Sequence, residues 1–179
     1  MLPSLIPSPL HPAVVHLPIA LAVLVPAFAV GALWSIRRGA RPLVAWGITT
    51  ALCAALSLSA WLAVQTGEQA DEQVESVVAE APIETHEEAA EAFLALSVIV
   101  LGIAAVGLGA GRVGRAARVV GTVGTVALLG AGWNVGHSGG ALVYRHGAAR
   151  AYTDTPAAPT LADRRPQTAA RSRDEEDGR

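Results

Sequence analysis

Four long apolar runs, separated by short polar or acidic connections, dominate the pattern of this chain. They cover about residues 13–34, 43–64, 92–111 and 119–138. At 1.5 Å per residue, a helix of about 20 residues spans the roughly 30 Å hydrocarbon core of a bilayer. We therefore predict an all-α fold, an up-and-down bundle of four transmembrane helices.

Two prolines, Pro18 and Pro26, interrupt the first run. Within a membrane bundle, neighbouring groups can satisfy the carbonyls that proline leaves free, so a kinked helix is predicted. A cleaved signal peptide is the alternative, because Ala27-Phe28-Ala29 has the small-residue pattern of a cleavage site. Positive residues follow this run instead of preceding it, which favours a retained span.

The second run carries Trp46 and Trp61 near its two ends, where amphipathic indoles favour the membrane interface. Valines recur at helical spacing beyond this run, so the helix is expected to continue into water before Pro82 stops it. Thr85-His86-Glu87-Glu88 has the form of a capping box. A third helix is therefore predicted to begin there, with Thr85 as its N-cap.

Glycines are frequent in the last two runs and allow helix backbones to approach closely. From Thr153 onward, Pro, Ala, Arg and acidic residues alternate without hydrophobic periodicity. We predict a transmembrane domain over residues 1–152 and a disordered polar tail over 153–179.

The composition supports a membrane location. Hydrophobic residues make up 52% of the chain and charged residues 16%, whereas a soluble domain carries about a quarter charged residues. Aromatic residues are only 4%, so small and aliphatic side chains must fill the interior. Cys53, the one cysteine, cannot form an internal disulfide.

The distribution of charge predicts the orientation. The connections 35–41 and 112–118 contain arginine and no acid, whereas residues 65–91 contain nine acidic side chains and no arginine. By the positive-inside rule, the two arginine-bearing connections face the cytoplasm and both termini lie outside. We expect contact with the lipid bilayer and no nucleic-acid partner.

Histidines lie at the ends of three of the four runs. His11 and His16 open the first run, His86 precedes the third, and His137 closes the fourth. Counting the helical rise from the cytoplasmic ends places His16 and His137 both at roughly 27 Å, near the outer edge of the hydrocarbon. His11 and His86 come out at roughly 35 and 38 Å, in the headgroup layer.

Neutral imidazoles on facing helices are good ligands for Fe, Cu, Zn and Ni. Two ligands at equal depth suit a flat cofactor, so we predict haem b bound by His16 and His137, with His86 and His11 as further ligands or supporting groups. A transition metal on the same four histidines, or no cofactor, stays open. Arg145 either pairs with a haem propionate or anchors its helix at the headgroups. Each histidine taken alone is also compatible with a simple place at the interface.

Other chemical signals are weaker. Gly136-His137-Ser138-Gly139-Gly140 matches G-x-S-x-G, but a nucleophile elbow follows a strand and here a membrane helix precedes it, so we predict no catalytic residue. The acidic residues lack the alternating carboxylates and turn glycine of a calcium loop. The middle of each run contains no acid or arginine, which disfavours a transporter.

Two motifs resemble those of an uncharacterised family of bacterial four-span membrane proteins. They are H-P-x-x-V-H-x-P-I from His11 to Ile19 and G-H-x-G-G-x-L-V-Y from Gly136 to Tyr144. The resemblance covers roughly residues 8–147. Members of that family are sometimes joined to c-type cytochrome or Rieske modules, which implies a redox setting in a bacterial cytoplasmic membrane. These 179 residues carry no such fused module.

The sequence thus predicts a multi-pass membrane protein whose outward-facing histidine cluster binds haem b or a metal and takes part in electron transfer. It favours a redox carrier or membrane subunit over an enzyme with its own substrate, with a c-type cytochrome or a Rieske protein as redox partner. The alternative is a non-catalytic membrane subunit or docking protein without a cofactor. A homo-oligomer is left open.

Overall fold

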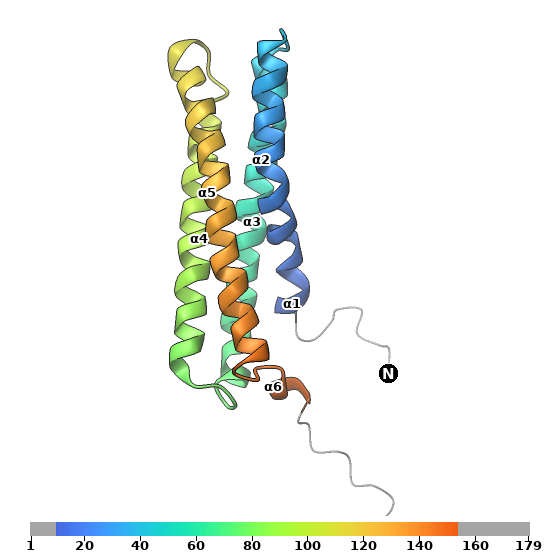
Figure 1. The fold of residues 1–179 in the computed structure, drawn as a ribbon, viewed down its shortest axis with the longest axis vertical. Helices are drawn as coiled ribbons and strands as arrows, with labels where there is room; N and C mark the ends of the chain where they lie inside the picture. The colour runs from blue at the N-terminus through green and yellow to red at the C-terminus, as the bar shows by residue number, and fades with distance from the viewer. Residues whose placement is uncertain (1–9, 154–179) are drawn as a thin grey trace, which may run out of the picture.

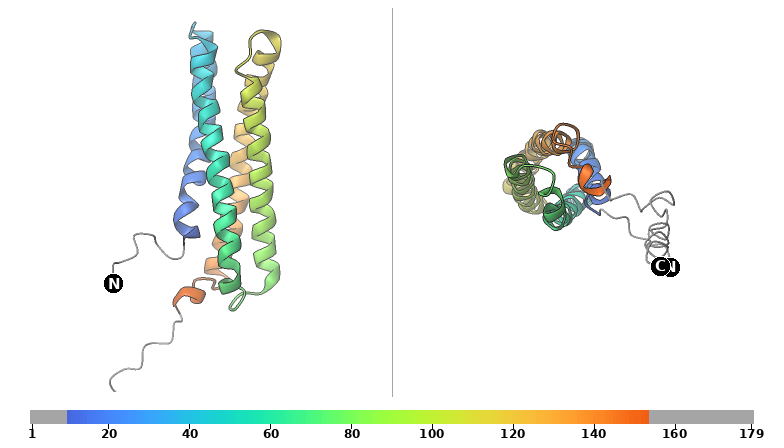
Figure 2. Two further views of the ribbon diagram at one scale, coloured as in Figure 1. Left: turned by 180° about the vertical axis from the view of Figure 1, so that it is seen from behind. Right: turned by 90° about the horizontal axis from the view of Figure 1, so that it is seen from below.

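Four long helices form the body of the protein (Figure 1). The computed structural model describes residues 10–153. The long helices are α2 (His16–Arg37), α3 (Pro42–Val74), α4 (Glu80–Val106) and α5 (Gly111–Tyr144), and the short helices are α1 (His11–Val14) and α6 (Arg150–Thr153). Successive long helices run antiparallel and pack in the ring order α2, α3, α4, α5, with α5 closing against α2 (Figure 2). The predicted up-and-down bundle is confirmed.

The outer surface of the bundle is apolar. Each of the four long helices is long and apolar enough to cross a membrane. Large side chains point outward, and Leu43, Val123 and Trp133 expose 65%, 65% and 78% of their surface. Apolar surface of this extent is unfavourable in water and favourable against lipid. The fold is that of a multi-pass membrane protein.

The helices extend beyond the apolar runs at the acidic end of the bundle. α3 continues past its apolar part to Val74. α4 then begins at Glu80, with Pro82 in its first turn, where the missing N–H of proline has no helical partner to lose. The predicted capping box is therefore wrong. Thr85 lies inside α4, and its hydroxyl donates to the Ala81 carbonyl at 2.9 Å.

α5 begins at Gly111, before the predicted apolar start at Val119. This earlier start places Arg118 inside the helix, where it is only 4% exposed. Its guanidinium donates to the carbonyls of Gly107 at 2.6 Å and Gly109 at 3.3 Å. Arg118 therefore satisfies carbonyls at the end of α4 rather than standing free in the loop.

The first membrane helix is divided near its start into α1 and α2, at Val15. Pro18 has no N–H to donate to the Val14 carbonyl, and α1 ends at Val14 before α2 begins at His16. Pro26 lies inside α2, which continues through it.

The interior of the bundle is built from residues spaced alternately three and four apart, which we call the inner seam. Its buried members are Pro18, Ala22, Val25, Ala29 and Ala32 on α2; Trp46, Thr49, Cys53, Leu56, Ala60 and Ala63 on α3; Phe93, Ser97, Val100 and Ala104 on α4; and Arg118, Gly121, Thr125 and Leu128 on α5. This spacing keeps one stripe of each helix facing the bundle axis, as in left-handed bundles.

Trp46 lies in the inner seam, so its predicted position at the membrane interface is wrong. The indole is 0% exposed, and its Nε1 donates to the Ala104 carbonyl at 2.8 Å. The absence of a side chain at Gly107 makes room for it, because a Cβ there would collide with the indole nitrogen. Trp61, outside the seam, is 48% exposed.

Beyond Thr153, the predicted disordered tail lies outside the described residues. Thr153 itself ends α6, which lies at the same end of the bundle as α1 (Figure 1).

The contact between Gly107 and Trp46 can be tested by thermal or denaturant unfolding in detergent. Gly107→Ala should lower the free energy of unfolding by about 1–3 kcal/mol, as for an overpacked core. Gly102→Ala on the same helix is the control, because a Cβ there meets nothing within 4 Å. It should be neutral or stabilising by about 0.5–1 kcal/mol. Equal stability of the two variants would contradict the packing described for Trp46.

Candidate histidine site

All five histidines, with His146 just after α5, lie toward the end of the bundle that contains α1, the connection between α3 and α4, and the end of α5. His11 and His86 are half-buried, whereas His16 and His137 are exposed. The ring centroids of His11 and His86 are 6.4 Å apart, and the ring planes meet at 83°. The structure thus brings together His11 and His86. It leaves His16 and His137, which were predicted to be the ligand pair, on the surface of the bundle.

The spacing of the inner seam explains this arrangement. Continued backward from Pro18, the alternating steps of three and four lead through Val15 to His11. Continued backward from Phe93, they lead through Ala90 to His86. His16 and His137 fall between seam positions and therefore point away from the bundle axis.

His11 is anchored to α3. Its Nδ1 lies 2.9 Å from the Ala63 carbonyl oxygen and 3.3 Å from Thr66 Oγ1. A carbonyl oxygen only accepts hydrogen bonds, so Nδ1 carries the proton and donates it. Gly67 gives the ring its space, because a Cβ there would lie 3.3 Å from His11 Cε1.

His86 is anchored to α5 in the same way. Its Nδ1 lies 2.9 Å from Ser138 Oγ. The Ser138 hydroxyl donates its only proton to the Val135 carbonyl at 3.0 Å, so Ser138 must accept the bond from His86. Gly139 makes room for the imidazole, because a Cβ there would lie 2.9 Å from His86 Cε1.

Both imidazoles are therefore protonated at Nδ1, so Nε2 is the unprotonated nitrogen whenever the ring is neutral. No hydrogen bond within residues 10–153 engages either Nε2 atom. Histidines that bind metals usually donate their other ring N–H to a carbonyl or similar acceptor, which fixes the tautomer and the ring orientation. His11 and His86 have this arrangement.

The number of ligands limits which metal group the pair can hold. Within residues 10–153, no group of three or more His, Cys, Asp or Glu side chains could hold a metal ion. Protein zinc sites use three or four protein ligands. A haem needs at most two axial ligands from the protein, because the porphyrin supplies the in-plane nitrogens. Two imidazoles on one metal, at about 2.0–2.1 Å per bond, have ring centroids roughly 6 Å apart, which is close to the 6.4 Å between the rings of His11 and His86.

A second apolar cluster closes this end of the bundle. Val78, Ile83 and Ala148 are buried together, and Val74 and Leu142 pack against them. α6 lies against α3, and burial together with the negative charge of Asp71 raises the pKa of Tyr152. The chain that follows α5 therefore packs near Asp71 on the acidic extension of α3.

Arg145 is exposed at the C-terminal end of α5, toward the same end of the bundle as the histidines. No hydrogen bond joins Arg145 to a histidine within residues 10–153. Its proposed role toward a propionate stays a prediction.

Three partners of the histidines were not predicted from the sequence: the Ala63 carbonyl, Thr66 and Ser138. Ser138 was considered only as a nucleophile, but it lies inside α5 and accepts the bond from His86. The signal that could have found these partners is the pair of glycines, Gly67 and Gly139, that face the rings.

Comparisons of this chain with models of protein families, with curated proteins and with solved structures find no match. The resemblance that the two motifs suggest therefore stays a prediction, and the geometry of the histidine pair carries the functional proposal.

The tautomers can be measured from the ring nitrogen shifts of ¹⁵N-labelled histidine in haem-free protein at alkaline pH. His11 and His86 should both be Nδ1–H tautomers, whereas the exposed His16 and His137 should show mixed populations. Ser138→Ala removes the acceptor for His86 and should change the His86 signals while those of His11 keep their positions. An Nε2–H tautomer at either His11 or His86 would contradict the assignment.

Proposed function

We propose that this protein is a b-type haem protein of a bacterial cytoplasmic membrane that carries electrons, with His11 and His86 as the axial ligands. One observation carries the proposal: two half-buried imidazoles from α1 and α4, each anchored through Nδ1, lie 6.4 Å apart. The family resemblance, with its cytochrome and Rieske fusions, supports the same setting.

In this proposal, the two ring nitrogens of each histidine have different roles. His11 and His86 offer Nε2 from two different helices, so binding would tie α1 to α4. The bonds from Nδ1 to the Ala63 carbonyl and the Ser138 hydroxyl hold the rings in place and make Nε2 a stronger ligand. Bound haem supplies one-electron chemistry, and the polarity around it sets the potential.

We place the histidine end of the bundle on the outer side of the membrane. Exposed arginines lie at the opposite end, at Arg37, Arg38 and Arg41 and again at Arg112 and Arg115, which the positive-inside rule assigns to the cytoplasm. Acidic residues are concentrated at the histidine end. A redox partner such as a c-type cytochrome or a Rieske protein would approach this acidic face, and a basic partner surface would be attracted to it.

A non-catalytic docking subunit is the second candidate, and exposed glycines on the outer surface favour it. A Cβ at Gly102, Gly130 or Gly136 would meet nothing within 4 Å, so another helix can approach these positions closely. Such a helix could belong to a partner subunit or to a second copy of this chain.

Four single variants test the haem proposal: His11→Ala, His86→Ala, His16→Ala and His137→Ala. Each protein is purified from cells supplied with haem, and haem per protein and the reduced absorption spectrum are compared. His11→Ala and His86→Ala should lose haem or become five-coordinate, because each removes an axial bond. His16→Ala and His137→Ala are the matched controls and should keep the wild-type spectrum.

The reverse ranking would show that the ligands are His16 and His137. A colourless, metal-free wild-type protein would refute the haem proposal and favour the docking subunit.

The orientation is tested with cysteines in the two kinds of loop. Ala79→Cys, in the connection between α3 and α4, should react with an impermeant thiol reagent added to intact cells, whereas Ala40→Cys, in the connection between α2 and α3, should not. Both alanines are exposed, and the native Cys53 is buried, so the background should be low. The opposite labelling would place the histidines on the cytoplasmic side.

A further inference from the structure

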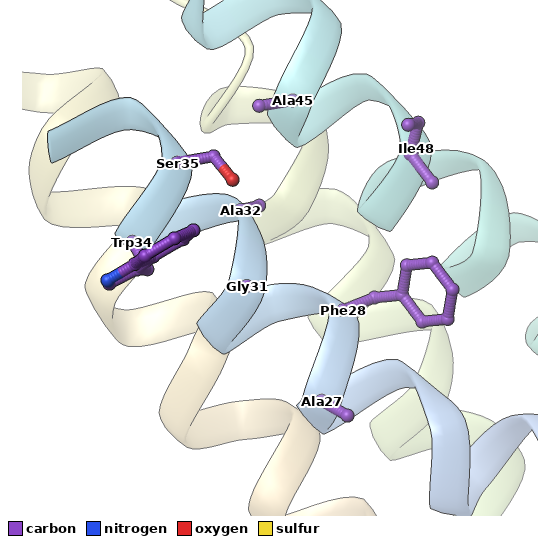
Figure 3. A pocket seen from close by; sticks show the side chains of 8 residues that line it. All are labelled: Ala27, Phe28, Gly31, Ala32, Trp34, Ser35, Ala45 and Ile48. Atoms are coloured by element: carbon purple, nitrogen blue, oxygen red, sulfur yellow. The ribbon is translucent and has the colours of Figure 1, made fainter. Parts of the chain in front are cut away.

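A groove of about 450 Å³ lies on the lipid-facing surface of the bundle between α2 and α3 (Figure 3). It lies near the end of α2 and the start of α3, at the end of the bundle opposite the histidines (Figure 1). Its apolar lining includes Ala27, Phe28, Gly31 and Ala32 from α2 and Ala45 and Ile48 from α3. Phe28 and Ile48, 45% and 52% exposed, belong to the facing helices. The groove therefore opens toward the surroundings of the bundle, which for these helices is lipid.

Small residues make the groove. Gly31 has no side chain, and a Cβ there would meet nothing within 4 Å. Ala32 and Ala45 contribute only methyl groups on the two sides. A flexible apolar chain fits such a surface, because the surface offers dispersion contacts and has few polar groups that would need a hydrogen-bond partner.

Arginine side chains are grouped next to the groove, where α2 ends. Trp34 lines it, and the Arg38 guanidinium lies 5.0 Å from the centroid of the Trp34 ring. Arg37 and Arg41 are exposed on the same connection, which contains no acidic residue. An occupant that matches both parts is apolar along the groove and anionic where α2 ends.

We propose that this groove binds an anionic phospholipid, with one acyl chain between α2 and α3 and the phosphate beside Arg37 and Arg38. Basic residues at the end of a membrane helix attract anionic headgroups, and each one near the surface strengthens binding by roughly fivefold. A zwitterionic lipid offers the same chain without the net charge, so it is retained less. The site is separate from the histidines and does not depend on haem.

The full chain is purified in detergent, mixed with equal amounts of phosphatidylglycerol and phosphatidylcholine, and the retained lipid is counted by native mass spectrometry. Wild type should retain one phosphatidylglycerol in preference to phosphatidylcholine. Arg37→Gln with Arg38→Gln should lower this retention by about tenfold or more. Arg112→Gln with Arg115→Gln removes the same charge from two other exposed arginines at the same end of the bundle, and it should change retention by no more than about twofold.

A second pair of variants tests whether the acyl chain binds in the groove. Gly31→Phe puts a ring at the groove and should displace the lipid, whereas Gly102→Phe on α4 should not; an added Cβ meets nothing within 4 Å at either glycine. The proposal is overturned if the two arginine pairs have equal effects, if the two lipids are retained equally, or if Gly31→Phe keeps the lipid. Conversion of a dimer to a monomer by Gly31→Phe, with lipid unchanged, would show that the groove is instead an interface between two copies.

Discussion

Close packing along the inner seam is the constraint on which the rest of this structure depends. Lipid is as apolar as the helix surfaces, so the bundle is held together by dispersion contacts and interhelical hydrogen bonds rather than by removal of apolar surface from water. Both require short distances between helices. Alanines at 22, 29, 32, 60 and 104 and the glycine at 121 provide these distances. At the arginine end, Trp46 and Arg118 then reach carbonyls at the end of α4, so polar bonds join three of the four helices there.

At the histidine end, the imidazoles of His11 and His86 are packed in the same way as the indole of Trp46 at the opposite end. In both places a large ring occupies the seam, a glycine of another helix leaves space for it, and a ring N–H donates across the interface. The chemical outcome differs because indole has a single nitrogen, a donor, which Trp46 uses completely. An imidazole has two nitrogens, so His11 and His86 bond to the neighbouring helices through Nδ1 and retain Nε2 as a second polar atom. The proposed ligand pair is therefore a consequence of how the bundle accommodates rings in its seam.

The four helices could be predicted from the sequence because apolar runs long enough to span a bilayer are rare in soluble proteins. The buried face of each helix could not, because lipid-facing positions such as Val23 and Val123 are as apolar as the seam. Only the spacing of small residues marks the seam. This spacing determines whether His11, His16 and Trp46 point toward the bundle axis or toward the surface. The estimated heights fixed depth but not rotation about the helix axis, so they favoured His16 over His11. The partner Ser138 was missed because it is a partner only through the packing of α4 on α5.

The two ends of the bundle differ in a way that restricts how the proposed carrier works. Between them the seam is filled by Leu56, Val100 and Leu128, each about 1% exposed. Electrons that reach the histidine pair would therefore enter and leave on the same face, the acidic one, rather than cross the membrane through the bundle. The second apolar cluster, formed by Val78, Ile83 and Ala148, lies at this same end of the bundle. If the proposed function holds, this asymmetry suits a relay between two partners on one side of the membrane.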